Sequence, residues 1–233
     1  MTVDEERRSA STQIFVAGDV LDIDGPIVLD SASEHHLTRV LRLSEGEHVS
    51  VSDGVGRWRL AGVIYAGGSL ALEPVGPVAV TPRPQPPLTI ATAIPKGDRV
   101  DWLVQKAVEI GIDTVQFLHA ERSVVRWKAV RAAKQVERLN RIAHEAARQS
   151  RRVWLPEVRP PVPALEVLAS SVVAEPSGRD IAAGDTFISV GPEGGWSPSE
   201  LAIATAQVQL GHNVLRTETA VLVAATLCVS ISR

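Results

Sequence analysis

The fold is decided by residues 88–118, LTIATAIPKGDRVDWLVQKAVEIGIDTVQFL. Leu88–Ile94 is an apolar run that suits a buried strand, and Pro95-Lys96-Gly97 then turns the chain. Asp98 can cap a helix that follows this turn. The apolar residues of that helix recur at i, i+3, i+4, i+7 and i+8, and they are Val100, Leu103, Val104, Ala107 and Val108. The segment therefore predicts a strand followed directly by a helix with one buried face.

The end of this segment completes a strand–helix–strand unit. Gly111 stands where a left-handed residue ends a helix, and Thr114–Leu118 is a second apolar strand. This order predicts a parallel sheet, and so an α/β domain. The elements predicted after it are a helix at about Trp127–Gln149, a loop at Pro156–Pro163, a short helix at Ala164–Ala169, a strand at Thr186–Val190, a helix from Ser197 or Pro198 to Gln207, a strand at Asn213–Leu215 and a closing apolar helix at Thr219–Ile231.

The first third of the chain has the pattern of a separate small β-domain, a barrel or a sandwich. Its apolar stretches, separated by turn signals, are Ile14–Val16, Ile27–Leu29, His48–Val51, Trp58–Tyr65 and Ser69–Leu72. One short helix is predicted at Ser33–Leu41, with Ser33 as its cap. Residues 81–87, TPRPQPP, contain four prolines and predict a stiff linker. We therefore expect a β-domain over residues 1–80, a linker over 81–87 and an α/β domain over 88–233.

The composition is that of a protein expected in the cytoplasm. Hydrophobic residues make up 45% of the chain and charged residues 22%, which is ordinary for a soluble protein with a core. No apolar run reaches the roughly 18 residues of a membrane span, and Met1–Ser11 lacks the apolar core of a secretory signal. Cys228 is the only cysteine, which excludes a cysteine-based metal cluster. The adjacent pair His35-His36 is by itself a weak set of metal ligands, so we expect no metal, and we also expect no membrane partner.

Positive charge is concentrated in one stretch, although the net charge of the chain is −3. Residues 122–152 contain ten basic and two acidic residues, a balance of +8, so that the rest of the chain carries −11. Such segregation creates a local positive field that suits nucleic acid. The alternative is a solvated helix with a basic face.

The most distinctive local pattern is the predicted strand Thr186–Val190 entering the turn Gly191-Pro192-Glu193-Gly194-Gly195. Open α/β sheets bind ligands where the carboxyl end of a strand enters such a turn, since glycines let the backbone approach a ligand. The alternative is an ordinary tight turn. The chain has no G-x-x-x-x-G-K-[ST] motif, and Leu88–Lys96 has no glycine cluster. A nucleoside cofactor, if there is one, is therefore expected near the C-terminus.

A second pattern is a polar stretch within Leu210–Ala220, between an apolar strand and an apolar helix. Thr217 or Thr219 can cap the last helix, and Glu218 is favourable at its positive end. Capping does not explain Arg216, whose charge is unfavourable there unless it meets an anionic partner. The stretch is thus a candidate for binding an anion.

Taken together, these two patterns resemble the C-terminal signature of SPOUT-class methyltransferases. The family that they resemble most methylates N3 of a uridine in small-subunit (16S) ribosomal RNA. Further matches to that family, in the same order, are Phe15-Val16 with His35-His36-Leu37 and Val40-Leu41-Arg42-Leu43, then Lys96 with Lys106-Ala107-Val108-Glu109-Ile110-Gly111, then Glu121-Arg122-Ser123, and then Glu145–Arg152. The chain departs from the pattern by an acidic N-terminal extension and a stop soon after the last helix.

The resemblance implies a trefoil-knotted SPOUT domain with a parallel sheet, preceded by a PUA-like RNA-binding β-barrel. It implies a bent S-adenosylmethionine held by three C-terminal loops, and a homodimer for which the Leu222–Ile231 face is suited. The residues that match the cofactor-binding loops are Gly191, Pro192, Glu193, Gly194, Gly195, Leu210, Gly211, Val214, Leu215, Arg216, Thr217, Thr219 and Ala220. Of the five tryptophans, Trp196 is the one expected near the cofactor.

For the reaction, Arg216 is the first candidate to stabilise charge on uridine O2 or O4. Glu218 or Glu193 is a candidate proton acceptor, although either can instead hold Arg216 or cap a helix. The residues expected to bind ribosomal RNA are Arg39, Arg42, Arg122, Arg126, Arg148, Arg151 and Arg152. Two alternatives stay open from sequence: a non-catalytic RNA-binding protein of ribosome assembly, and a small-molecule α/β enzyme.

Overall fold

A computed structural model describes residues 3–232, and the chain divides into two compact units. Unit 1 contains the residues up to Arg83 together with Ala147–Leu155. Unit 2 contains Pro84–Ala146 and the residues from Pro156 onward. The division at residues 83 and 84 falls inside the proline-rich segment, whereas 147–155 belong to unit 1 and not to the α/β part in which the sequence placed them.

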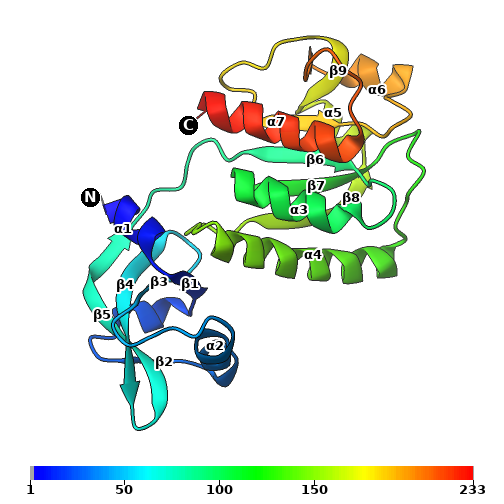
Figure 1. Cartoon of the computed structure of the whole chain (residues 1–233). Helices are drawn as coiled ribbons and strands as arrows, with labels where there is room; N and C mark the ends of the chain where they lie inside the picture. The colour runs from blue at the N-terminus through cyan, green and yellow to red at the C-terminus, as the bar shows by residue number, and fades with distance from the viewer. Residues whose placement is uncertain (1–2, 233) are drawn as a thin grey trace. The chain divides into compact units, whose positions relative to one another are not determined.

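Unit 1 is built on a five-stranded mixed sheet in the order β1-β3-β4-β5-β2 (Figure 1). The strands are β1 (Thr12–Phe15), β2 (Ile27–Val28), β3 (His48–Ser52), β4 (Arg57–Ala66) and β5 (Ser69–Val80). Only the β1–β3 pair among them is parallel. The helical segments are α1 (Val3–Ser9), a 3₁₀ turn (Gly18–Asp22), α2 (Ser31–His35) and a π-helical turn (His36–Val40).

Most of the β-pattern of unit 1 is confirmed, and its helices differ in detail. Alternate apolar residues of the strands, such as Val49, Val51 and Val63, are buried in one core with Leu37. The sequence did not predict α1. The cap of α2 is Asp30 rather than Ser33, because the Asp30 carboxylate accepts a hydrogen bond of 2.8 Å from the Ser33 backbone N–H.

Two glycines allow the segment 147–155 to pack closely against the rest of unit 1. Gly54 and Gly56 have φ of 76° and 99°, which disfavours any other residue. A Cβ on Gly54 would lie 2.5 Å from Leu155 Cδ1, and one on Gly56 would lie 2.5 Å from Trp154 Cζ2. A side chain at either glycine would therefore displace this segment.

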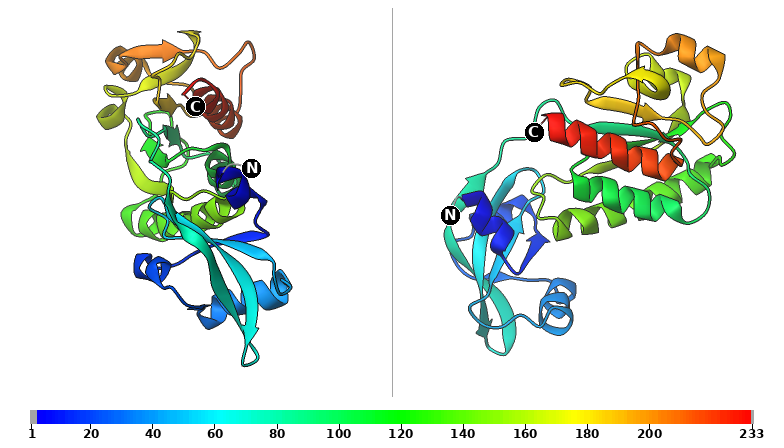
Figure 2. Two further views of the ribbon diagram at one scale, coloured as in Figure 1. Left: turned by 90° about the vertical axis from the view of Figure 1, so that its left-hand side faces the viewer. Right: turned by 45° about the horizontal axis from the view of Figure 1, so that its top comes forward.

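Unit 2 is built on a six-stranded sheet in the order β11-β9-β10-β6-β7-β8, and every pair in that order is parallel. Its strands are β6 (Thr89–Ala93), β7 (Thr114–His119), β8 (Glu157–Pro163), β9 (Val172–Arg179), β10 (Phe187–Val190) and β11 (Ala206–Val208). Its helices are α3 (Arg99–Ile110), α4 (Ala129–Gln149, whose last three residues belong to unit 1), α5 (Leu165–Leu168), α6 (Pro198–Ile203) and α7 (Thr217–Ser232). Helices α3 and α7 lie side by side on one face of the sheet, and α5 and α6 lie on the other (Figures 1 and 2).

The strand–helix–strand order predicted at residues 88–118 is confirmed, but Asp98, at the N-cap position of α3, makes no side-chain capping hydrogen bond. The five residues of the predicted apolar stripe of α3 are all buried. Gly111 ends the helix with φ of 127°, and its N–H donates to the Ala107 carbonyl at 3.1 Å. A parallel sheet follows, as expected.

The structure differs from the sequence prediction at three places in the later part of unit 2. Residues 157–163 form β8 and not a loop, because an edge strand tolerates the prolines that suggested a loop. The strand β9, with Glu175-Pro176-Ser177-Gly178 in its second half, was not predicted at all. The strand before the closing helix is β11 and not Asn213–Leu215, because α6 already ends at Ile203.

Candidate active site

Three loops of unit 2 converge on one pocket with a volume of about 160 Å³. They follow β10 and β11 and lead into α7, at the carboxyl ends of parallel strands where open α/β sheets bind ligands. Ten of the thirteen residues predicted to bind the cofactor line this pocket: Gly191, Pro192, Glu193, Gly195, Leu210, Gly211, Val214, Leu215, Thr217 and Ala220. The folded chain thus brings together segments that are well separated in sequence.

Hydrogen bonds fix the first and third loops to each other and to the sheet. The buried Thr217 hydroxyl donates to the Gly191 carbonyl at 3.2 Å. The indole N–H of Trp196 donates to the Ala174 carbonyl of β9 at 3.1 Å. The pocket therefore has a wall that is fixed by its own side chains.

The glycines of these loops serve two different purposes. Gly195 and Gly211 have φ of 70° and 123°, and nothing lies within 4 Å of the place where a Cβ would stand. At Gly191, by contrast, a Cβ would lie 2.9 Å from Cε2 of Trp196. The first two glycines leave open space beside the pocket, whereas the third permits close packing behind it.

The other three residues predicted to bind the cofactor do not line this pocket. The Gly194 carbonyl accepts a hydrogen bond of 3.1 Å from the guanidinium of Arg122. Arg216 and Thr219 are exposed and line a second hollow, described below.

Six residues line the pocket beyond the predicted loops: Ala174, Glu175, Pro176, Val190, Trp196 and Asn213. Trp196 was expected near the cofactor, and it is a buried part of the wall. Glu175 adds a half-buried carboxylate. The sequence analysis missed Glu175 because it did not identify β9 as a strand of the same sheet.

The second hollow is lined by Asp98, Arg99, Trp102, Arg216, Glu218 and Thr219. Glu218 is only 6% exposed, and its Oε1 accepts a hydrogen bond of 2.5 Å from Nη1 of Arg99. Its Oε2 is buried and has no hydrogen-bond partner among the described residues. Of the three residues predicted to be catalytic, Arg216 and Glu218 line this hollow, and Glu193 is an exposed residue on the wall of the first pocket.

The loop that carries Arg122 is tied to the start of α6 through Glu200, which is 2% exposed. One carboxylate oxygen of Glu200 accepts from the Glu121 backbone N–H at 2.8 Å, and the other accepts from the Ser197 N–H at 2.8 Å, completing a capping box. Hydrogen bonds from the Ser197 and Ser199 hydroxyls hold the pKa of the Glu121 carboxyl below its usual value. This network fixes Arg122 beside the glycine-rich loop.

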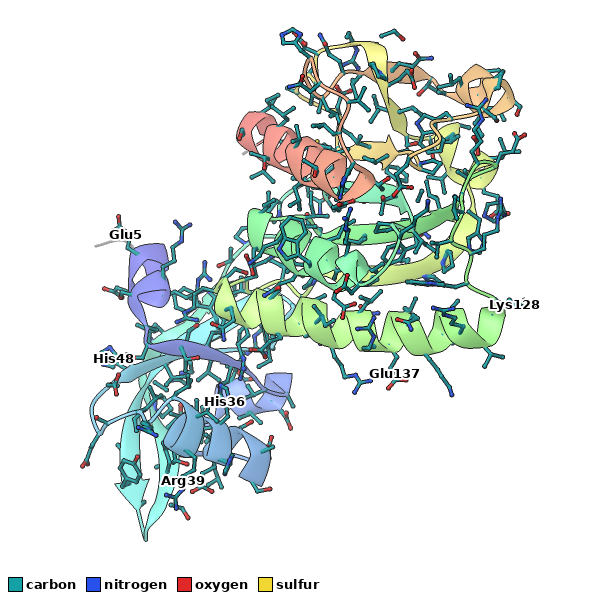
Figure 3. All side chains as sticks on the ribbon, turned by 45° about the vertical axis from the view of Figure 1, so that its right-hand side comes forward. Glu5, His36, Arg39, His48, Lys128 and Glu137 are labelled. Atoms are coloured by element: carbon teal, nitrogen blue, oxygen red, sulfur yellow. The ribbon has the colours of Figure 1, made fainter. Side chains whose placement is uncertain are left out.

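The basic residues of unit 2 are largely exposed. Arg122 and Arg126 lie on the surface before α4, and Arg126 also donates to the Ala120 carbonyl at 2.6 Å. Figure 3 shows Lys128 next to the start of α4, and Glu137 pointing away from the sheet. The exposed cations on or next to α4 are Lys128, Arg131, Lys134 and Arg141.

The basic residues that belong to unit 1 fall into two groups. Arg39, labelled in Figure 3, and Arg42 are exposed. Arg148, Arg151 and Arg152 are half-buried, and Arg151 donates to the carbonyls of Ala10, Ser11 and Arg148 at 3.0, 2.8 and 3.2 Å. Burial and the neighbouring charges of Arg148 and Arg7 lower the pKa of the Arg151 guanidinium. Arg151 thus holds the segment after α1 in place, a use that the sequence did not indicate.

Both units have counterparts among known proteins. Residues 81–229 match the model of the RNA methyltransferase domain family, and residues 31–72 match that of the RNA methyltransferase PUA domain. The chain belongs to the RNA methyltransferase family. This family assignment confirms the fold class expected from sequence, a SPOUT-class α/β domain with a parallel sheet beside a PUA-like domain.

Several curated relatives of this RNA methyltransferase have the same name. Proteins called "Ribosomal RNA small subunit methyltransferase E" are 36% identical in Mycobacterium tuberculosis, covering 91% of this chain and 88% of the relative, and 32% identical in Bacillus subtilis, covering 82% and 84%. A crystal structure of the protein of that name from Neisseria gonorrhoeae, bound to S-adenosyl methionine, has a TM-score of 0.75 at 29% identity and covers 92% of this chain and 94% of its own. A probable rRNA-methyltransferase from Porphyromonas gingivalis has a TM-score of 0.72 at 30% identity and covers 95% and 98%.

Residues 3–232 contain neither a helix suited to crossing a membrane nor a cluster of side chains suited to a metal. No helix in that range is long and apolar enough to cross a membrane. No group of three or more histidine, cysteine, aspartate or glutamate residues in the same range is arranged to hold a metal ion.

Proposed function

We propose that this RNA methyltransferase transfers a methyl group from S-adenosylmethionine to N3 of a uridine in small-subunit (16S) ribosomal RNA. The observation that carries the proposal is the convergence of the three loops on one pocket. The relatives named as small-subunit methyltransferases and the neighbouring structure with S-adenosyl methionine bound support the same assignment.

The residues of the first pocket fit an adenosyl sulfonium. Val190, Leu210 and Leu215 offer apolar walls for a purine ring. Glu175 and Glu193 place two carboxylates on the same pocket, which suits a ligand with sulfonium and ammonium charges. The open space at Gly195 and Gly211 lets a ligand approach the backbone.

The cofactor supplies an electrophilic methyl group, so the tasks left to the protein are orientation and charge. Uridine N3 must lose its proton, which leaves negative charge spread over O2 and O4. Arg216, exposed at the N-terminus of α7, is the residue that we assign to this charge. Placing N3 in line with the methyl group contributes several kcal/mol to lowering the barrier.

Of the two carboxylates predicted to accept the proton, Glu193 is the better placed. It is exposed on the pocket wall, so it can return the proton to water. Glu218 is buried and already accepts a hydrogen bond from Arg99. We therefore assign proton transfer to Glu193 and a positioning role to Glu218.

RNA is held through the exposed cations in this proposal, on Arg39 and Arg42 of unit 1 and on Arg122, Arg126 and α4 of unit 2. The target uridine must be unpaired or extruded, because pairing hides N3. The substrate implies that the protein acts in the cytoplasm.

A second copy of the chain completes the proposed enzyme. Helix α7 carries the partly exposed apolar residues Leu222, Val223 and Leu227, and Ile231 is 42% exposed. A face of this kind is buried in a stable homodimer. Light scattering is expected to give the mass of a dimer for the wild type and of a monomer for Leu227→Glu. A monomeric wild type would contradict the dimer without affecting the proposed reaction.

The proposed reaction is tested in two steps. Calorimetry with S-adenosylmethionine is expected to show saturable binding, and incubation with labelled cofactor and 16S RNA is expected to yield 3-methyluridine. Absence of saturable binding would favour the non-catalytic RNA-binding alternative. Arg216→Ala is expected to keep cofactor binding and to lose about 10²-fold or more in the rate of methyl transfer. A wild-type rate for this variant would remove Arg216 from the mechanism.

A further inference from the structure

The second hollow is lined by segments of the chain that are neighbours of the segments lining the proposed cofactor pocket. Strands β6 and β10 are parallel neighbours, with Val190 opposite Thr92. The chain leaving β6 leads to Asp98 and Arg99 of this hollow, and the chain leaving β10 leads to Gly191 of the pocket. The start of α7 contributes to both, since Thr217 lines the pocket and Arg216 lines the hollow.

Two guanidinium groups line the hollow. The Arg99 side chain is 42% exposed, and the ion pair with Glu218 uses one of its five N–H donors. That pair joins the first turn of α3 to the first turn of α7, so Glu218 fixes where the remaining donors of Arg99 lie. Arg216 brings a second set of donors to the same hollow.

A large aromatic surface lines the same space. Trp102 is 46% exposed, although the two residues that follow it, Leu103 and Val104, are buried. An indole left open beside two cations offers a face on which a nucleobase can stack.

We infer that this hollow receives the uracil ring of the target nucleotide. This role rests on the function proposed above. The N–H donors of Arg99 and Arg216 bind the two carbonyl oxygens, O2 and O4, and the indole of Trp102 stacks on the face of the uracil ring. The N3 atom between those oxygens then faces the neighbouring cofactor pocket. Both guanidinium groups stabilise the anion that forms when N3 loses its proton.

This arrangement also selects the base. Uracil presents two acceptors, O2 and O4, to two donors, whereas cytosine presents an amino donor in place of O4. A cytosine would therefore place its amino group against one guanidinium, which loses its acceptor, while O2 still accepts from the other guanidinium. Arg99 is in this inference a specificity-determining residue, and Glu218 is the residue that positions it.

The test combines cofactor binding with the pH dependence of methyl transfer. Arg99→Gln and Trp102→Ala are expected to bind S-adenosylmethionine as the wild type does, because neither residue lines the first pocket. At neutral pH, Arg99→Gln is expected to transfer methyl about 10²-fold more slowly and to recover part of the rate as pH rises, because alkali removes the N3 proton that the lost cation helped to release. The rate of methyl transfer by Arg99→Lys is expected to lie between the rates of the wild type and of Arg99→Gln.

Trp102→Ala is expected to raise the KM for RNA about 5- to 100-fold with a smaller change in kcat, while Trp102→Phe keeps most of the affinity. Arg159→Gln is the matched control. Arg159 is 50% exposed and paired with Glu157, so this variant removes an equally exposed, ion-paired charge outside the hollow. Wild-type kinetics and pH profiles in Arg99→Gln and Trp102→Ala would overturn the inference. A wild-type protein that fails to bind the cofactor would instead overturn the proposed function.

Discussion

The side-chain hydroxyl of Thr217, at the first residue of α7, donates a hydrogen bond to the backbone carbonyl of Gly191, and both residues line the candidate cofactor pocket. The two residues are 26 positions apart in sequence. Through this bond the turn after β10 is held by the same helix start that carries Arg216 and Glu218.

Loss of that bond is expected to weaken cofactor binding. Thr217→Val keeps the shape of the side chain and leaves the Gly191 carbonyl without its partner, which costs about 1–3 kcal/mol for a buried group. Calorimetry is expected to show a dissociation constant for S-adenosylmethionine raised about 5- to 100-fold, with Thr217→Ser close to wild type. Equal affinities of the valine and serine variants would show that the bond does not shape the pocket.

Gly191→Ala is expected to destabilise unit 2. Its Cβ would lie 2.9 Å from the Trp196 ring, which cannot retreat without losing its hydrogen bond to Ala174. Overpacking of this kind costs about 1–3 kcal/mol, so thermal unfolding is expected several degrees below the wild type. The control is Gly25→Ala, since nothing lies within 4 Å of a Cβ there. An unchanged melting temperature for Gly191→Ala would show that Trp196 has room to move.

Cys228 is expected to be unreactive in the folded protein and to make stability depend on pH in alkali. Burial raises the pKa of its thiol to about 11 from an ordinary 9.0. Below pH 9 the thiol is neutral in both states, and between pH 9 and 11 only the unfolded chain releases the proton. The folded state therefore loses up to about 3 kcal/mol over that interval.

Two measurements test this behaviour of Cys228. A thiol reagent at pH 8 is expected to modify it only after denaturation. Urea unfolding between pH 8 and 11 is expected to show a shallower loss of stability in Cys228→Ala than in the wild type, and the difference isolates this thiol from the other groups that titrate there. Parallel curves for the two proteins would be incompatible with a raised pKa.

The cations at the start of α4 are expected to set the salt dependence of RNA binding. Replacing Lys128, Arg131 and Lys134 together by glutamine removes three exposed charges outside the cofactor pocket. The plot of the logarithm of the RNA-binding constant against the logarithm of the salt concentration is expected to become less steep by about 2. Each phosphate contact to a single strand contributes about 0.7 to this slope. Cofactor affinity is expected to stay unchanged, and Arg159→Gln is expected to keep the wild-type slope. A wild-type slope in the triple variant would show that RNA binds to another surface of the protein.

The parts of the fold that could be predicted from sequence are those with a strong local period. The buried stripe of α3 and its end at Gly111 follow from the sequence pattern alone, because an amphipathic helix buries its apolar face and a glycine commonly ends a helix. Strands β8 and β9 were missed because proline, glycine and charged residues interrupt them. Their pairing partners come from distant parts of the chain, so no local pattern reveals them.

The candidate site, like the fold, could be predicted from the sequence only in part. The glycine- and threonine-bearing loops were identified through a family resemblance, and ten of their residues do line one pocket. Glu175 was missed with β9. Arg99 was not singled out because its role depends on contact with Glu218, 119 positions later in the chain. The buried state of Glu218 was equally invisible, since sequence alone gives a helix-capping glutamate no reason to be enclosed.

Glu200 has a consequence for how the molecule responds to its surroundings. Its two carboxylate oxygens accept hydrogen bonds from the backbone N–H groups of Glu121 and Ser197, and the Arg122 guanidinium donates a hydrogen bond to the carbonyl of Gly194. These hydrogen bonds connect Arg122 to Gly194, whose neighbours Glu193 and Gly195 line the pocket. A polyanion that binds at Arg122 is therefore expected to hold in place the turn that lines the small-ligand pocket.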